Sequence, residues 1–251
     1  MFIHIHGNLS DPLAVILHPM GITGEKMFDI VGSKLGKCCV ISPDMATHGD
    51  EKQDFISQEQ EAASLHSYLL SRGVTHISLL YGASLGCTVA LKLLDYHDIT
   101  IDAVYLDGAP VARLGIVMRT ILPPVLVSKK RSVIKNREKG ISGFVQLYGR
   151  DIGEHMGDTI KGMSDVSLSN IGKACVVGNT PKLTEEMQRR IWFHWGEKEL
   201  YTKKSAPLVK RIYPCANVII RSGFDHCEFM AKKTEEYSAF LRSLLEQKPT
   251  H

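Results

Sequence analysis

The stretch "LLYGASLGCTVAL" (79–91) contains one serine, Ser84, between Gly82 and Gly86. It begins with apolar residues typical of a buried strand and ends with residues that favour a helix. Two flanking glycines let a sharp strand-to-helix turn close without a clash, which would hold Ser84 in a strained conformation with its hydroxyl above the sheet edge. The free N–H groups at the start of the helix would lie beneath that hydroxyl, where they are suited to stabilise an oxyanion.

Short apolar runs rich in strand-forming residues recur along the chain. They are FIHIH (2–6), LAVILH (13–18), CCVIS (38–42), HISLLY (76–81), AVYLD (103–107), IWFHW (191–195) and NVIIR (217–221). Their continuous apolar character favours strands that are covered on both faces. Helix-period stretches separate several of them, such as 58–73, which ends at Gly73. This alternation predicts an α/β domain with a mostly parallel sheet.

The alternation stops between residues 111 and 190. This segment contains helical patches, a break at Pro123-Pro124, and only "ACVVG" (174–178) as a candidate strand. Because 80 residues are too many for a plain loop, we expect a helical cap over 111–190, lying over the carboxyl edge of the sheet. The core domain would then consist of 1–110 and 191–251.

The composition is that of an ordinary globular protein, with 44% hydrophobic and 23% charged residues. No run of 18 apolar residues predicts a membrane span, and the first residues do not resemble a signal peptide, so we expect a cytoplasmic protein. None of the six cysteines forms a CxxC pair. We therefore expect reduced cysteines and no structural metal site.

The positive charge is concentrated in 111–190, which holds 14 Lys and Arg against 7 Asp and Glu, although the net charge of the chain is only +3. Its densest part is "KKRSVIKNREK" (129–139). The ordinary interpretation is a solvated surface. The functional alternative is a positive field that draws anionic substrates to a site. Nucleic-acid binding is not expected, because no aromatic interleaving or binding motif accompanies the charge.

A serine nucleophile needs a base, and the base needs an acid that orients it. Of the eleven histidines, His226 in "SGFDHCEF" (222–229) is the one that follows a strand run and precedes the terminal helix. His226 is therefore the candidate base. His194 lies inside a strand run, where we expect it to pack.

Three carboxylates are candidates for the acid. Glu199 in "HWGEKELY" (194–201) is preferred, because its position three residues after Gly196 clears the strand end by one turn. Asp107 in "YLDGAP", after the preceding strand run, is the first alternative, and Glu197 is the second.

Ester hydrolysis also needs two N–H donors for the developing oxyanion. One is expected from Leu85, directly after the nucleophile, and the other from the loop that follows 13–18. Pro19 has no N–H, so Met20 is the preferred second donor, with Gly21 behind it.

Taken in chain order, these motifs resemble the α/β-hydrolase fold superfamily. The resemblance rests on the loop His18–Gly21, "PDMATHGDE" (43–51), the GxSxG turn at Ser84, "LDGAP" (106–110), "WGEKE" (195–199) and "GFDHCEF" (223–229). It implies a mostly parallel sheet of seven or eight strands flanked by helices, with a helical cap inserted after the sixth strand. It also implies a catalytic triad of Ser84, Glu199 and His226 under a lid. The chain departs from the family pattern in Pro19, in a glutamate acid, and in a short N-terminal portion that leaves seven strands.

The expected function is a serine hydrolase that cleaves a carboxylic ester of a small molecule through an acyl-enzyme, without a cofactor. The alternatives are a C–C bond hydrolase, thioesterase, amidase or acyltransferase with the same triad, or a non-catalytic ligand-binding member of the fold. The basic cap favours anionic or polar substrates.

Overall fold

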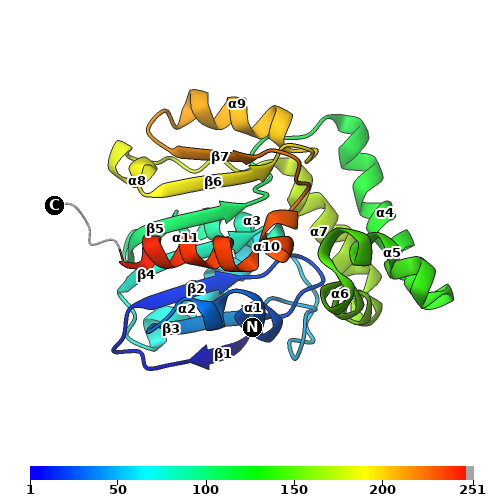
Figure 1. The fold of residues 1–251 in the computed structure, drawn as a ribbon, viewed down its shortest axis with the longest axis horizontal. Helices are drawn as coiled ribbons and strands as arrows, with labels where there is room; N and C mark the ends of the chain where they lie inside the picture. The colour runs from blue at the N-terminus through cyan, green and yellow to red at the C-terminus, as the bar shows by residue number, and fades with distance from the viewer. Residues whose placement is uncertain (247–251) are drawn as a thin grey trace.

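A seven-stranded sheet forms the centre of the computed structural model, which describes residues 1–246 (Figure 1). The strand order is β1-β3-β2-β4-β5-β6-β7, and every neighbouring pair is parallel except β1 with β3. The strands are β1 (Phe2–His6), β2 (Leu13–Leu17), β3 (Cys39–Asp44), β4 (His76–Ala83), β5 (Thr100–Asp107), β6 (Ile191–Gly196) and β7 (Asn217–Arg221). Each predicted apolar run contributes one strand, and the predicted fold class is confirmed.

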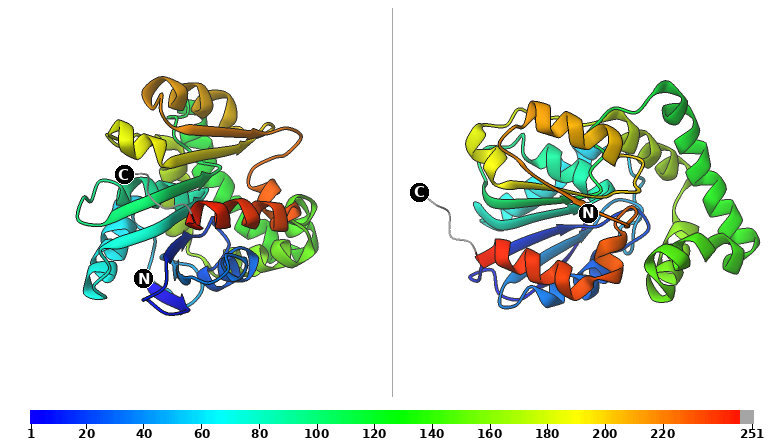
Figure 2. Two further views of the ribbon diagram at one scale, coloured as in Figure 1. Left: turned by 60° about the vertical axis from the view of Figure 1, so that its left-hand side comes forward. Right: turned by 45° about the horizontal axis from the view of Figure 1, so that its top comes forward.

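Helices cover both faces of the sheet (Figures 1 and 2). Along β2, Val15 and Leu17 join the core on one face, whereas Ala14 and Ile16 join the core on the other, as the alternation of strand side chains requires. The first face is covered by α2 (Gln58–Ser71), α3 (Leu85–Leu93) and α9 (Thr202–Ile212). The second is covered by α1 (Gly24–Ile30), the 3₁₀ turn η1 (Gly32–Lys34), α10 (Glu228–Lys232) and α11 (Thr234–Glu246). All five residues of β2 are buried, which explains their continuous apolar character.

The segment between β5 and β6 is helical, and all of its helices except the last and shortest lie beyond the carboxyl ends of the parallel strands (Figure 1). The last helix lies at the opposite edge of the sheet, beside the start of β6. The helices of this segment are α4 (Ile116–Lys135), α5 (Arg137–Tyr148), α6 (Arg150–Gly162), α7 (Asp165–Val177) and the short α8 (Glu185–Arg189). The longest, α4, has 20 residues, but no helix within residues 1–246 is long and apolar enough to cross a membrane.

Three details of this segment differ from the sequence prediction. It follows the fifth strand rather than the sixth, because the sheet has seven strands. The candidate strand at 174–178 is wrong: residues 174–177 complete α7, whose buried Leu168, Ile171 and Ala174 form one helical stripe. The predicted break at Pro123-Pro124 is also wrong, because α4 continues through both prolines.

Candidate active site

Ser84 lies at the junction of β4 and α3 with φ +49° and ψ −107°, a conformation that residues with a side chain rarely adopt. Its N–H donates to the Asp107 carbonyl oxygen at 2.7 Å. A Cβ added to Gly86 would lie 2.2 Å from the Leu17 carbonyl oxygen, and one added to Gly82 would lie 2.8 Å from the Gly86 carbonyl oxygen. Both glycines are therefore required by close packing at the turn that presents Ser84.

The ring of His226 lies between the serine and a carboxylate. Its Nε2 is 2.8 Å from Ser84 Oγ, and its Nδ1 is 2.7 Å from Glu199 Oε2. Gly108, which the sequence analysis did not single out, makes room for this ring: a Cβ there would lie 2.5 Å from His226 Cε1. A glycine directly after the polar end of a strand run was the signal that could have identified it.

Glu199 is buried, with 2% of its surface exposed, and both carboxylate oxygens have a partner. Oε1 accepts the Gly196 N–H, and Oε2 faces His226. Because an ionised carboxylate only accepts hydrogen bonds, Nδ1 of His226 carries a proton and Nε2 is left to accept the Ser84 hydroxyl proton. Burial lowers the pKa of His226, but the charge and hydrogen bond of Glu199, together with the charges of Asp107 and Asp225, outweigh burial and raise that pKa above its ordinary value.

The other two candidate acids lie elsewhere. Asp107 is fully buried, and its carboxylate accepts hydrogen bonds from His194 Nδ1 and from the Tyr237 hydroxyl, each at 2.8 Å. Glu197 accepts hydrogen bonds from the Ser222 hydroxyl at 2.8 Å and the Gly223 N–H at 3.0 Å, between the loops after β6 and β7. Of the three carboxylates, the structure brings Glu199 to His226.

The Asp107–His194 pair is a buried polar contact that the sequence analysis missed. Asp107 and His194 are register partners on the neighbouring parallel strands β5 and β6. The signal was available, because each strand run carries a polar residue at its carboxyl end. His194 does pack inside the strand, as predicted, with Asp107 as its partner.

The loop after β2 is held by His18. Its Nδ1 donates to the Pro19 carbonyl oxygen at 2.9 Å, and its Nε2 accepts the Met45 N–H at 3.0 Å. In a trans peptide the C=O and N–H bonds point in opposite directions, so the Met20 N–H points away from His18. Burial lowers the pKa of His18 to about 4, and the ring is neutral at neutral pH.

A second buried histidine, His48, accepts a hydrogen bond from this loop. The Gly21 N–H donates to His48 Nε2 at 3.1 Å, whereas the N–H groups of Met20 and Leu85 donate to no group within residues 1–246. Burial lowers the pKa of His48 to about 3, so this acceptor is neutral. Of these three N–H groups, those of Met20 and Leu85 therefore have no hydrogen-bond acceptor within the described residues.

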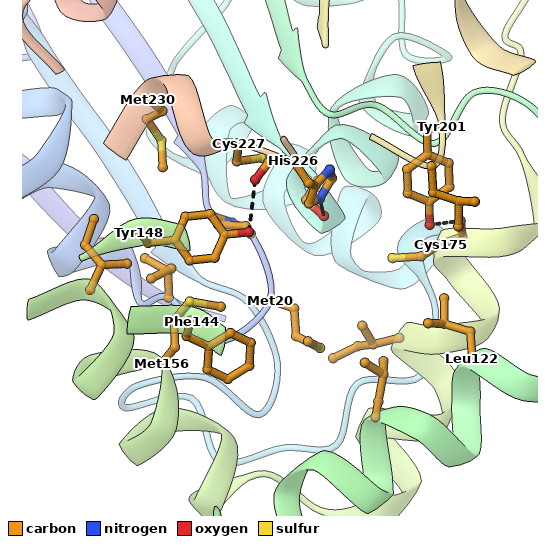
Figure 3. Close-up of a pocket in the computed structure, with 17 residues that line it drawn as sticks. Met20, Leu122, Phe144, Tyr148, Met156, Cys175, Tyr201, His226, Cys227 and Met230 are labelled. Carbon is orange, nitrogen blue, oxygen red and sulfur yellow. Dashed lines mark hydrogen bonds between the residues drawn. The ribbon is translucent and has the colours of Figure 1, made fainter. Parts of the chain in front are cut away.

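Ser84 and His226 open into a cavity of about 290 Å³ (Figure 3). Among the described residues, no Lys, Arg, Asp or Glu side chain lines it. The hydroxyls of its two tyrosines already donate to backbone carbonyl oxygens at 3.0 Å, Tyr148 to His226 and Tyr201 to Cys175 (Figure 3). The remaining walls come from Pro19, Met20, Ile22, Leu122, Leu126, Phe144, Ile152, Met156, Ile171, Cys175, Leu200, Cys227 and Met230. The cavity surface is therefore largely apolar, and Ser84 and His226 are the polar groups that it leaves free to meet a bound molecule.

No protein-family model matches the chain, and no curated protein sequence matches it. Solved structures do. An esterase from Exiguobacterium antarcticum has a TM-score of 0.75 at 14% identity, covering 98% of this chain and 95% of its own. A bromoperoxidase from Bacillus anthracis has 0.74 at 16%, covering 98% and 95%, and MenH from S. aureus has 0.68 at 16%, covering 98% of both chains. The chain has the α/β-hydrolase fold.

Proposed function

We propose that this chain of α/β-hydrolase fold is a serine hydrolase that cleaves carboxylic esters of small molecules. One observation carries the proposal: an unbroken hydrogen-bonded series runs from Ser84 Oγ through both ring nitrogens of His226 to Glu199, at 2.8 Å and 2.7 Å. A base that is within proton-transfer distance of an alcohol and is oriented by a carboxylate is the arrangement that activates a serine.

In the proposed reaction His226 takes the Ser84 proton while Oγ attacks the ester carbonyl carbon. Glu199 stabilises the imidazolium that forms, and the Met20 and Leu85 N–H groups stabilise the oxyanion. His226 then protonates the leaving alcohol. Water, activated by the same base, attacks the acyl-enzyme and releases the acid. Residues of this chain perform every step.

We also propose that residues 111–190 form a cap domain over the core of 1–110 and 191–251. Support comes from the cavity, because each long helix of the segment contributes to its walls. The side chains are Leu122 and Leu126 of α4, Phe144 and Tyr148 of α5, Ile152 and Met156 of α6, and Ile171 and Cys175 of α7.

The substrates proposed here are neutral and carry an apolar acyl or alcohol group, rather than being anionic or polar as the basic segment suggested. The cavity walls offer no counter-charge within residues 1–246. Moving an unpaired carboxylate from water into such a site costs several kcal/mol. Four of the six basic residues of 129–139 are exposed on the surface, where water screens their charge, and the half-buried Lys129 and Lys130 do not line the cavity.

The first test is labelling with a fluorophosphonate, which forms an adduct with an activated serine. We expect an adduct at Ser84 and none in Ser84→Ala, whose kcat on a neutral ester should fall by about 10³-fold or more. Glu197→Gln is the matched control for an acidic residue on the same loop as Glu199, and it should keep wild-type activity. A folded wild-type protein that takes no label would refute the proposal.

The second test compares kcat/KM for p-nitrophenyl hexanoate with that for the mono-p-nitrophenyl ester of adipic acid, which matches it in length and adds a carboxylate. We expect the neutral ester to be preferred by about 100-fold or more. Equal rates would remove the apolar-substrate proposal and leave the triad intact. Thioester and anilide analogues of the same acyl group test the alternative reactions, and a faster thioester or anilide would replace esterase activity as the assignment.

A further inference from the structure

The cap helix α4 exposes apolar side chains to solvent. Ile116 is 71% exposed, Val117 62%, Ile121 47% and Val125 49%. Contiguous exposed apolar residues on a soluble protein usually mark an interaction surface. The helix itself lies at the outer side of the molecule, beyond the end of the sheet (Figure 2), so these exposed side chains are accessible to a large partner.

The outer face of α4 changes from apolar to basic along its length. Val117 and Ile121 share this face with Arg131 and Lys135, which follow Val117 by 14 and 18 residues, close to four turns and five turns of the helix. Both basic side chains are exposed, Arg131 to 74%. The helix has no acidic residue, and its basic residues are Arg119, Lys129, Lys130, Arg131 and Lys135.

The apolar half of α4 also forms part of the cavity. Leu122 and Leu126 line the cavity, and they directly follow the exposed Ile121 and Val125 in the sequence. The same helical turns therefore present apolar side chains to solvent on one side and to the Ser84 cavity on the other. A hydrocarbon chain that reaches this helix from outside meets apolar surface up to the cavity wall.

We propose that the outer face of α4 docks on the surface of an anionic lipid bilayer, with Val117, Ile121 and Val125 in the headgroup–acyl boundary and Arg131 and Lys135 against the headgroups. Apolar side chains in the headgroup–acyl boundary and Lys or Arg side chains against anionic headgroups are two contacts that bind a protein to a membrane surface without crossing it. A second copy of the chain fits less well, because it would bring another helix with five basic and no acidic residues against this one. The docking site lies outside the triad and does not depend on the proposed reaction.

Cosedimentation of the full-length protein with vesicles tests this proposal. We expect binding to vesicles of phosphatidylcholine mixed with an equal amount of phosphatidylglycerol, at least tenfold weaker binding to phosphatidylcholine alone, and loss of binding in high salt. The triple variant Val117→Ser/Ile121→Ser/Val125→Ser should bind the mixed vesicles at least tenfold more weakly and keep its kcat/KM on a short soluble ester. Arg131→Glu/Lys135→Glu should lose the preference for the anionic lipid.

The control is Ile5→Ser/Ile220→Ser, which removes two exposed isoleucines from the edge strands β1 and β7 and should leave vesicle binding unchanged. Equal binding to both vesicle types, or wild-type binding by the triple variant, would overturn the proposal. So would a wild-type dimer in sedimentation equilibrium that the triple variant converts to a monomer without any vesicle binding, because a second copy would then cover this face.

Discussion

The charge of one residue, Glu199, makes the largest contribution that raises the proton affinity of the proposed base, His226. The carboxylate is buried and directed at His226 Nδ1, so the imidazolium form is stabilised although the ring is largely removed from water. The result is a raised His226 pKa. A base must be neutral to accept the serine proton, so the activity is expected to fall as the pH drops through this raised pKa.

Glu199→Gln tests the origin of that shift. The amide keeps the shape of the side chain but removes its charge, so the pKa of His226 should fall and the acid limb of kcat/KM should move to lower pH. The kcat should decrease roughly 10²- to 10⁴-fold, since the imidazolium is no longer stabilised. The measurement is a pH–rate profile on a neutral ester, with Glu197→Gln as the control. An acid limb that stays at the wild-type pH would show that Glu199 does not act on His226.

Among the elements, the turn from β4 into α3 depends on Gly86 because a backbone atom occupies the space that its Cβ would take. Gly86→Ala would place a methyl group 2.2 Å from the Leu17 carbonyl oxygen of β2, and α3 would have to move away from the sheet. We expect a loss of about 3 kcal/mol or more in the free energy of unfolding, together with loss of Ser84 labelling.

Gly143→Ala is the matched control for this prediction. Gly143 lies inside α5, where an added Cβ meets nothing within 4 Å. Alanine should therefore stabilise the protein by about 0.5–1 kcal/mol through helix propensity. Urea denaturation of both variants measures the two changes. Equal stability of Gly86→Ala and wild type would contradict the packing argument.

The strands could be predicted from the sequence because burial on both faces leaves a continuous apolar signature, as in β2. The helices of 111–190 gave a weaker signature, since Ala174–Val177 reads equally well as a short strand or as the last turn of a helix. A segment of this kind forms a strand only where a neighbouring strand can pair with it, and a short stretch of sequence does not reveal that neighbour. The turn at Ser84 was predictable because both glycines flank the serine in the sequence, although the carbonyl oxygen that Gly86 must avoid belongs to β2.

The sequence alone does not identify the carboxylate that contacts His226, nor does it reveal the buried pair of Asp107 and His194. Asp107, Glu197 and Glu199 all follow strand runs, and spacing alone could only rank them. The partner of each carboxylate depends on the direction in which its side chain points. Glu199 contacts His226, whereas Asp107 contacts His194 and Tyr237. The polarity of the cavity was likewise hidden, because the basic residues of 111–190 do not line it.

At the scale of the whole molecule, two buried histidines that are neutral in the folded state make the free energy of unfolding depend on pH. The pKa values of His18 and His48 are lowered by burial to about 4 and about 3 in the folded state, whereas both are near 6.5 in the unfolded chain. Below about pH 6.5 the unfolded chain therefore binds protons that the folded chain does not. The free energy of unfolding should consequently fall as the pH decreases from about 6.5 to 4.5.

His48→Gln should make this fall smaller by about 2 kcal/mol, because glutamine does not titrate. The free energy of unfolding of this variant at pH 7 is also expected to be lower than that of the wild type, since glutamine does not reproduce the position of the ring nitrogen that accepts the Gly21 N–H. The slope between the two pH values is therefore the quantity to compare, by urea denaturation at pH 6.5 and pH 4.5. A variant with the same slope as the wild type would show that His48 does not contribute.

The hydrogen bonds made by the two cavity tyrosines affect how a molecule can enter the cavity. Tyr148 of α5 is fastened to the peptide of His226, and Tyr201, two residues after Glu199, is fastened to α7. An outward movement of α5 that widened the cavity would therefore break the hydrogen bond to the peptide that carries the His226 ring. Access to the cavity and the position of this ring are coupled through that bond.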